Sequence, residues 1–293
     1  MFIVGKDGDE VNEYTLSTGY DVSTASYDSN FSVASQDTIP QDIVFNTDGT
    51  KMFIVGEGND AVYEYTLSTG FDVSTASYDS NFSIASQETS PQGLAFNNDG
   101  TKMFITGDGG KDVNEYTLST GFDVSTASFV DSFDISSEDG LPNGLAFNSD
   151  GTKMFVTGNR GNDINEYTLS TGFDVSTASF VGNISVSSQD TTPSGIKFNH
   201  DGTKLFMVGV VGADINEYTL TSPFSLVNIS GEHTGDVINS SNTSTQDTDV
   251  DIETLTVTAV RTGNSEGSGT AGTVGQSLTG TYGDLTLNAN GSY

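Results

Sequence analysis

The chain has 293 residues, no cysteine and a net charge of −31, from 40 acidic and 9 basic residues. The lack of cysteine excludes a disulfide framework and cysteine-based metal or redox sites, and the negative charge disfavours nucleic acids and anionic membranes as partners. No apolar run reaches the ~18 residues that a membrane-spanning helix needs. Abundant Gly, Ser, Thr, Asn and Asp, with no long helical pattern, indicate an all-β protein.

One motif organises the chain and recurs every 51 residues. Phe-Asn-x-Asp-Gly-Thr-Lys-Met/Leu-Phe stands at Phe45–Phe53, Phe96–Phe104, Phe147–Phe155 and Phe198–Phe206. Asp-Gly between two apolar runs predicts a hairpin, because glycine adopts positive φ without steric cost. A repeat of this length predicts a solenoid, a propeller or an array. Met1–Gly5 matches Met52–Gly56, so we expect the sequence to be a slice of a longer array.

Each unit is predicted to hold four strands. In the unit that begins at Pro91, we expect them at Pro91–Phe96, Lys102–Ile105, Val113–Leu118 and Phe129–Ser136. The second strand is an unbroken apolar run, which indicates burial on both faces. Four strands in about 50 residues is typical of a propeller blade, whereas solenoid coils are usually shorter. We therefore predict a β-propeller over residues 1–224, incomplete, with four to five four-stranded blades.

The repeat also resembles known propeller families. Phe-Asn-x-Asp-Gly-Thr-Lys-Met-Phe-Ile/Val is similar to the blade motif of the YVTN and TolB-like propellers. The following Glu-Tyr-Thr-Leu-Ser-Thr-Gly-Phe-Asp-Val segment resembles arrays in large surface proteins of marine bacteria and in phage fibres. The resemblance implies a propeller in an extracellular or cell-surface setting.

A second domain is predicted for residues 225–293, where the composition changes. Glu253–Val260 alternates with period two, as a half-buried strand does, and Leu278–Tyr282 and Leu285–Tyr293 are predicted hairpin strands. Thr281–Tyr293 resembles the core of VCBS domains, which are cadherin-like repeats of bacterial adhesins. The resemblance implies a partial C-terminal β-sandwich.

A calcium site is predicted within this second domain. Asp247, Asp249, Asp251 and Glu253 alternate along the chain, and hard oxygen ligands at short spacing suit Ca²⁺. The stretch also resembles the acidic entry strand of VCBS domains, although Ile252-Glu253 stands where that family usually has Gly-Asp. The alternative is a solvated acidic linker.

The remaining repeated polar residues are assigned structural roles. The Asp of each Asp-Gly pair serves the turn. A second set of aspartates, in the Gly-rich loops, is expected to cap backbone N–H groups: Asp60, Asp112, Asp163 and Asp214. The lysine after each turn is expected to pair with a nearby acid, and each Glu-Tyr pair to hold a core-facing Tyr beside an outward Glu.

The functional prediction follows from what the motifs lack. The channel-lining first strands, Gly-Leu-Ala-Phe and Gly-Ile-Lys-Phe, offer no carboxylate, and no catalytic triad, Walker or Rossmann motif is present. We therefore predict a non-enzymatic extracellular or cell-surface protein, whose propeller binds a glycan or a cell-surface protein beside neighbouring repeats of a longer chain. The alternatives are a propeller hydrolase or lyase with catalytic residues in missing blades, and a structural phage-fibre component.

Overall fold

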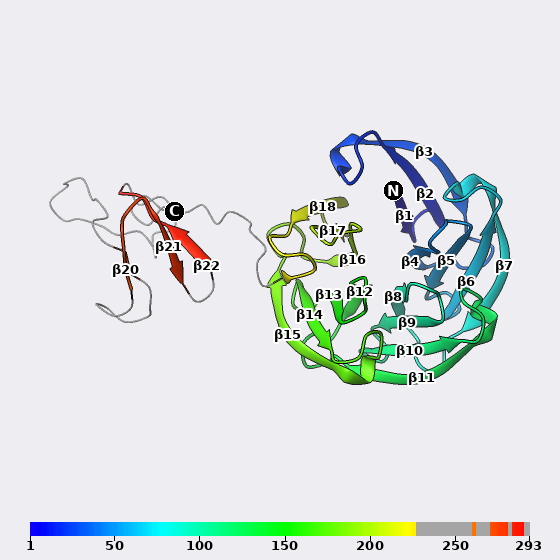
Figure 1. Cartoon of the computed structure of the whole chain (residues 1–293). Coiled ribbons are helices and arrows are strands. Elements are labelled where there is room, and N and C mark those ends of the chain that lie inside the picture. The colour runs from blue at the N-terminus through cyan, green and yellow to red at the C-terminus, as the bar shows by residue number, and fades with distance from the viewer. Residues whose placement is uncertain (227–259, 262–269, 281–282, 290–293) are drawn as a thin grey trace. The chain divides into compact units, whose positions relative to one another are not determined.

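The computed structural model describes residues 1–226, 260–261, 270–280 and 283–289. The chain divides into two compact units, Met1–Ile229 and Ser230–Tyr293. The first is a β-propeller, in which five antiparallel sheets stand around a common centre like blades (Figure 1). The prediction of an all-β propeller is confirmed. The described residues contain no helix long and apolar enough to cross a membrane.

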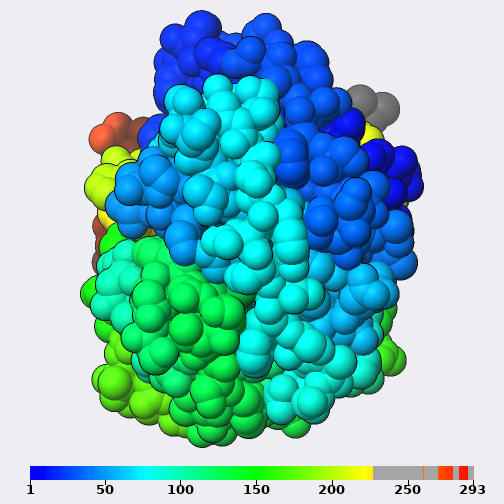
Figure 2. All heavy atoms as spheres, turned by 90° about the vertical axis from the view of Figure 1, so that its right-hand side faces the viewer, coloured from blue at the N-terminus to red at the C-terminus, as the bar shows by residue number. Residues whose placement is uncertain are grey.

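The three middle blades have four strands each, running from the centre outward. Their bounds are β4 (Pro40–Phe45), β5 (Lys51–Gly56), β6 (Ala61–Leu67) and β7 (Ala76–Ser83); β8 (Pro91–Phe96), β9 (Lys102–Gly107), β10 (Asp112–Leu118) and β11 (Ala127–Asp134); β12 (Pro142–Phe147), β13 (Lys153–Gly158), β14 (Asp163–Leu169) and β15 (Ala178–Ser185). Figure 2 views the rim from the side, where the cyan outer strand β7 crosses the surface between its neighbours.

The first and last blades have three strands each within the described residues. Blade 1 consists of β1 (Phe2–Gly5), β2 (Glu10–Leu16) and β3 (Ala25–Ser32), and blade 5 of β16 (Pro193–Phe198), β17 (Lys204–Gly209) and β18 (Asp214–Thr219). By the 51-residue repeat, β1 is a second strand, so blade 1 has no inner strand among the described residues. Likewise, no outer strand is described beyond β18.

The burial pattern explains why the second strands are apolar throughout. From Met103 to Gly107 every residue of β9 is buried, because neighbouring blades cover both faces. The fourth strands begin two residues before the predicted positions: β11 starts at Ala127, directly after the 3-10 turn η3 (Val124–Thr126). Asp123 caps this turn by accepting a hydrogen bond from Ser125 N.

The Asp-Gly hairpins form as predicted. Gly100 has a φ of 71°, and Asp99 accepts hydrogen bonds from Thr101 N and Thr101 Oγ1. These bonds lower the pKa of Asp99. The equivalent glycines Gly49, Gly151 and Gly202 have the same φ of 71°.

Gly100→Ala is expected to destabilise the propeller by about 2–4 kcal/mol. A Cβ at this position would overlap the ring of Phe122, and a left-handed backbone costs a non-glycine residue about 1–2 kcal/mol before any clash. Urea denaturation measures the loss. Gly182→Ala is the control, because a Cβ there meets nothing within 4 Å; equal losses in the two variants would contradict the argument.

Adjacent blades are joined by one repeated ion pair. Lys102 Nζ on β9 lies 2.6 Å from Glu115 Oε1 on β10 and donates to Phe173 O of the next blade at 2.6 Å. The other carboxylate oxygen of Glu115 accepts from Val175 N, also in the next blade. The lysine–acid pairing is confirmed, but the expectation of an outward Glu is wrong, because Glu115 is buried. The neighbouring Tyr116 is buried as predicted.

The same contacts close the ring between blade 5 and blade 1. Lys204 Nζ lies 2.5 Å from Glu217 Oε1 and donates to Tyr20 O at 2.8 Å. Tyr20 is the equivalent of Phe173 in the repeat, so the joint has the same design as the three joints between blades 2 and 5. Val22 N completes it by donating to Glu217 at 3.5 Å. Five units are therefore the number at which this repeat closes on itself.

In the second unit, four short strands are described. β19 (Val260–Arg261) pairs with β20 (Ala271–Gly272), and β21 (Ser277–Gly280) pairs with β22 (Gly283–Thr286). The predicted hairpin is present, although Gly283 and Asp284, which were placed between its strands, lie within β22.

Candidate ligand site in the central cavity

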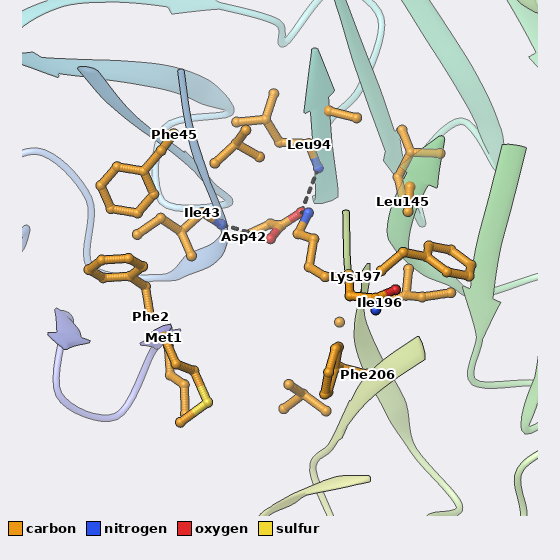
Figure 3. A pocket seen from close by; sticks show the side chains of 18 of the residues that line it. Met1, Phe2, Asp42, Ile43, Phe45, Leu94, Leu145, Ile196, Lys197 and Phe206 are labelled. Atoms are coloured by element: carbon orange, nitrogen blue, oxygen red, sulfur yellow. Dashed lines mark hydrogen bonds and ion pairs between the residues drawn. The ribbon is translucent and has the colours of Figure 1, made fainter. Parts of the chain in front are cut away.

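A cavity of about 1080 Å³ lies at the centre of the propeller. The inner strands β4, β8, β12 and β16 line it, together with β1 (Figure 3). Apolar side chains that are only partly buried make up much of the lining: Phe2, Ile3, Val4, Ile43, Val44 and Phe206. Apolar walls with a few polar groups are typical of small-molecule sites.

Two charged residues interrupt this apolar lining. Lys197 Nζ, on β16, lies 3.3 Å from Asp42 Oδ2, on β4, and Figure 3 shows the two side chains meeting in the middle of the cavity. The other inner strands have Gly at the position of Asp42, and Val or Ala at the position of Lys197: Gly93, Gly144, Gly195, Val44, Ala95 and Ala146. The pair therefore departs from the repeat at the centre of the propeller, where the inner strands of the blades lie closest together.

The bonding capacity of the two partners differs. The Asp42 side chain is only 12% exposed and accepts hydrogen bonds from Leu94 N at 3.0 Å and Ile43 N at 2.7 Å, in addition to the lysine. The Lys197 side chain is 47% exposed and, within the described residues, donates to Asp42 alone. An ammonium group has three donors. The free hydrogen-bonding capacity of the site thus lies on Lys197.

The expectation that the channel-lining strands carry no carboxylate is wrong. It was drawn from the later copies of the first strand, whereas the first complete copy, Pro40–Phe45, has Asp42 in place of glycine. The carboxylate fits because its oxygens bind two backbone N–H groups, which offsets the cost of burial. A position-by-position comparison of the four inner strands is the signal that reveals both Asp42 and Lys197.

Another set of acids holds the loops between second and third strands. Glu88 is buried and accepts from Ser90 N, Gly109 N and Gly110 N. Its counterparts, also buried, are Asp37, Asp139 and Asp190. The capping role that the sequence suggested for the loop aspartates thus belongs to these residues. Three of the loop aspartates instead accept from Asn side chains two residues on: Asp112, Asp163 and Asp214.

Asp108 lies beside this carboxylate group, and its own pKa is raised to about 6. Burial is the main cause, followed by the charges of Glu57 and Glu88. Its Oδ1 atom is buried without a hydrogen-bond partner. The ionised form of Asp108 is therefore disfavoured in the folded state.

Asp108→Asn is expected to stabilise the protein at pH 7 by about 1 kcal/mol, after discounting for the partial exposure of the group. Because the folded pKa lies above the unfolded value of 3.8, the parent gains stability as pH falls from about 6 towards 4, and the variant lacks this gain. Thermal midpoints between pH 4.5 and 8 measure it. Asp99→Asn is the control of opposite sign; a loss of stability in Asp108→Asn at pH 7 would refute the expectation.

The predicted calcium ligands Asp247, Asp249, Asp251 and Glu253 lie outside the described residues, so this site stays a prediction. Among the residues that the structure describes, no group of three or more acids and histidines is placed to hold a metal ion.

Comparisons with known proteins give fold likeness alone. No family model matches the chain, and no curated protein matches it. A functionally unknown protein from Desulfotomaculum acetoxidans is similar with 14% identity and a TM-score of 0.47, over 78% of this chain and 71% of that one. A periplasmic gluconolactonase of Pseudomonas aeruginosa has 15% identity and a TM-score of 0.43, over 76% and 66%. A virginiamycin B lyase of Staphylococcus aureus has the same identity and TM-score, over 76% of this chain and 67% of that one.

The prediction that this protein is not an enzyme is corrected, because the reason given for it is wrong: the cavity does hold a carboxylate, Asp42, opposite a lysine. The resemblance to YVTN-type propellers agrees with the likeness in fold to solved structures, while the comparisons provide no match for the VCBS resemblance.

Proposed function

We propose that the propeller is the binding domain of an extracellular or cell-surface protein and that its ligand lies in the central cavity, against Lys197. The single observation behind this proposal is a half-exposed ammonium group with unused donors in a cavity with apolar walls. A buried carboxylate fixes its position, so the lysine is held ready for a second acceptor. The setting outside the cell is supported by the resemblance of the repeat to surface arrays.

The chemistry of the cavity defines the ligand class. Lys197 requires an acceptor oxygen, from a carbonyl or a single carboxylate, and the partly exposed apolar side chains of Phe2, Ile43 and Phe206 favour an apolar body. The net charge of −31 disfavours polyanions such as polyphosphates. The expected ligand is therefore a neutral or monoanionic molecule that carries both a carbonyl group and an apolar portion.

A thermal-shift screen of small carbonyl and carboxylate compounds tests this proposal. Compounds that raise the melting temperature of the parent are expected to lose at least ten-fold in affinity with Lys197→Ala, because the variant lacks the donor. Lys6→Ala is the matched control, since Lys6 is exposed and lies outside the cavity. The proposal fails if every hit binds Lys197→Ala as well as it binds the parent.

A second candidate is glycan binding at the rim. One aromatic side chain at the same position of each outer strand is 42–56% exposed: Tyr27, Tyr78, Phe129 and Phe180. Each packs edge to face on a third-strand tyrosine, as Tyr78 does on Tyr65 at 5.9 Å, which leaves it oriented on the surface. Regularly spaced aromatic faces suit sugar rings. A glycan array probed with the parent and with a Tyr27→Ser/Tyr78→Ser variant tests this candidate, and equal binding by both would exclude it.

A further inference from the structure

The cavity has one side that is built differently from the rest. β4, β8, β12 and β16 each pair with the second strand of their own blade, whereas β1 pairs with β2 alone within the described residues. The other edge of β1 faces the cavity, and Phe2, Ile3 and Val4 belong to the cavity lining. An unpaired strand edge presents free N–H and C=O groups and acts as a template for another strand.

A repeated cluster of three aromatic rings shows what this side lacks. In blade 3, Phe96 of the inner strand lies 4.6 Å from Phe53, on the second strand of blade 2, and 5.6 Å from Phe122, while Phe53 and Phe122 lie 6.1 Å apart (distances between ring centroids). The inner-strand rings of the next two blades make the same close contact: Phe104–Phe147 at 4.6 Å and Phe155–Phe198 at 4.7 Å. Each of these clusters thus takes one of its three rings from an inner strand.

Between blade 5 and blade 1 the third ring is missing. Phe206 and Tyr20 stack at 6.4 Å, close to the spacing of Phe53 and Phe122, but no inner-strand Phe among the described residues lies against them. Phe206 is accordingly only half-buried, whereas Phe53, Phe104 and Phe155 are fully buried. In Figure 3, Phe206 and Phe2 lie on opposite sides of the open part of the cavity, beside the Asp42–Lys197 pair.

The glycines of the inner strands give an independent indication of the same gap. A Cβ on Gly93 or Gly144 would collide with the backbone of the next inner strand, at Leu145 N or Ile196 N. A Cβ on Gly195 would meet only the side chain of Val208, at 3.7 Å. The place beside β16 where the next inner strand belongs is thus empty of the described chain.

We propose that this side of the cavity is a strand-binding groove, whose occupant is an extended Pro-x-Gly-Leu-Ala-Phe segment of another 51-residue repeat. The segment adds to β1 as an inner strand, by the β-strand addition used in peptide recognition. The register of β8 on β9, shifted by two repeats, places its Phe opposite Met1, its Leu opposite Ile3 and its Pro opposite Gly5. The Phe ring then completes the cluster of Phe206 and Tyr20.

This inference rests on the proposed function, because the added strand would occupy part of the same cavity and would itself be the ligand. A peptide in extended form presents a carbonyl oxygen at every residue, which is the acceptor that Lys197 requires. Its Leu and Phe side chains supply the apolar portion. A neutral segment of this kind also avoids the repulsion that the negative propeller exerts on anions.

The test uses a synthetic peptide of residues Thr89–Asn98, acetylated and amidated, added to the full chain and followed by calorimetry. We expect one peptide per chain, a raised melting temperature and slower hydrogen exchange at the amides of Phe2–Gly5. A peptide with Asp in place of Leu94 and Ala in place of Phe96 is expected to bind at least ten-fold more weakly. Phe206→Ala is expected to weaken the parent peptide at least ten-fold, whereas Val181→Ser, at an exposed position of the outer strand β15, leaves binding unchanged.

The possible failures are distinguishable. Equal binding of the two peptides, or no effect of Phe206→Ala, overturns the groove. Dimers of the free chain that the peptide does not dissociate show that a second copy fills the groove, which also overturns the proposed occupant. If the peptide fails while small carbonyl ligands still depend on Lys197, only this inference is lost. If neither binds, the proposed function fails with it.

Discussion

Glu115→Ala is expected to lower the free energy of unfolding by about 3 kcal/mol. The carboxylate is buried between two blades and has three partners: Lys102 Nζ, Val175 N and, through the lysine, the backbone of the next blade at Phe173. Its removal leaves the Lys102 ammonium group without a counter-charge and Val175 N without an acceptor. Uncompensated groups of this kind account for the large cost of breaking a buried ion pair. Urea denaturation followed by circular dichroism measures the loss.

Glu217→Ala is the matched control, because it removes the same group from the joint that closes the ring. There the carboxylate is 26% exposed, against 4% for Glu115, and its contact with Val22 N is longer, at 3.5 Å. Solvent stabilises the lysine that is left behind, so the expected loss is 1 kcal/mol or less. A double variant, Glu115→Ala/Lys102→Met, should lose less than the sum of the single changes. A Glu115→Ala loss no greater than that of Glu217→Ala would contradict this account of the joints.

The architecture was predictable because its local signals repeat. The Asp-Gly pair that places Gly100 at positive φ recurs in every copy, and so does the unbroken apolar run of β9. A pattern found in all copies is not an accident of one segment, so the prediction of hairpins and of strands buried on both faces is secure. The joints were not predictable in the same way. Glu115 and Lys102 lie on adjacent strands, 13 residues apart, but Val175, whose backbone N–H donates to Glu115, lies 60 residues from Glu115. Only the packing of one blade against the next shows that Glu115 is buried.

The candidate site was missed for a different reason. A repeat directs attention to what its copies share, whereas Asp42 and Lys197 are the positions at which single copies differ. They are 155 residues apart in sequence and come together only because the ring brings blade 2 and blade 5 to the same cavity. The sequence predicts that one inner strand is missing, since it has five second strands and four inner strands. The aromatic rings that border the gap beside β1 are seen only in the structure.

Phe104→Ala is expected to be the most destabilising single change considered for the propeller, at about 3–5 kcal/mol. The ring is fully buried and packs against Phe147 at 4.6 Å and Phe173 at 6.1 Å. Deleting a buried aromatic ring removes its transfer free energy and leaves a cavity that rigid neighbouring strands cannot fill. Thermal and urea unfolding of the variant measure the loss.

Phe206→Ala is the control at the equivalent position, and it connects stability to the strand-binding groove. Its ring contacts Tyr20 but no inner-strand Phe of the described residues, and it is only partly buried, so its loss should cost about 1–2 kcal/mol in the free chain. With the inner-strand peptide of residues Thr89–Asn98 at saturation, the stability of the parent rises by its binding free energy, while the variant gains much less. The difference between parent and Phe206→Ala should then approach that measured for Phe104→Ala. A difference that stays the same with and without peptide would mean that the rings of Phe206 and Tyr20 do not receive a third ring.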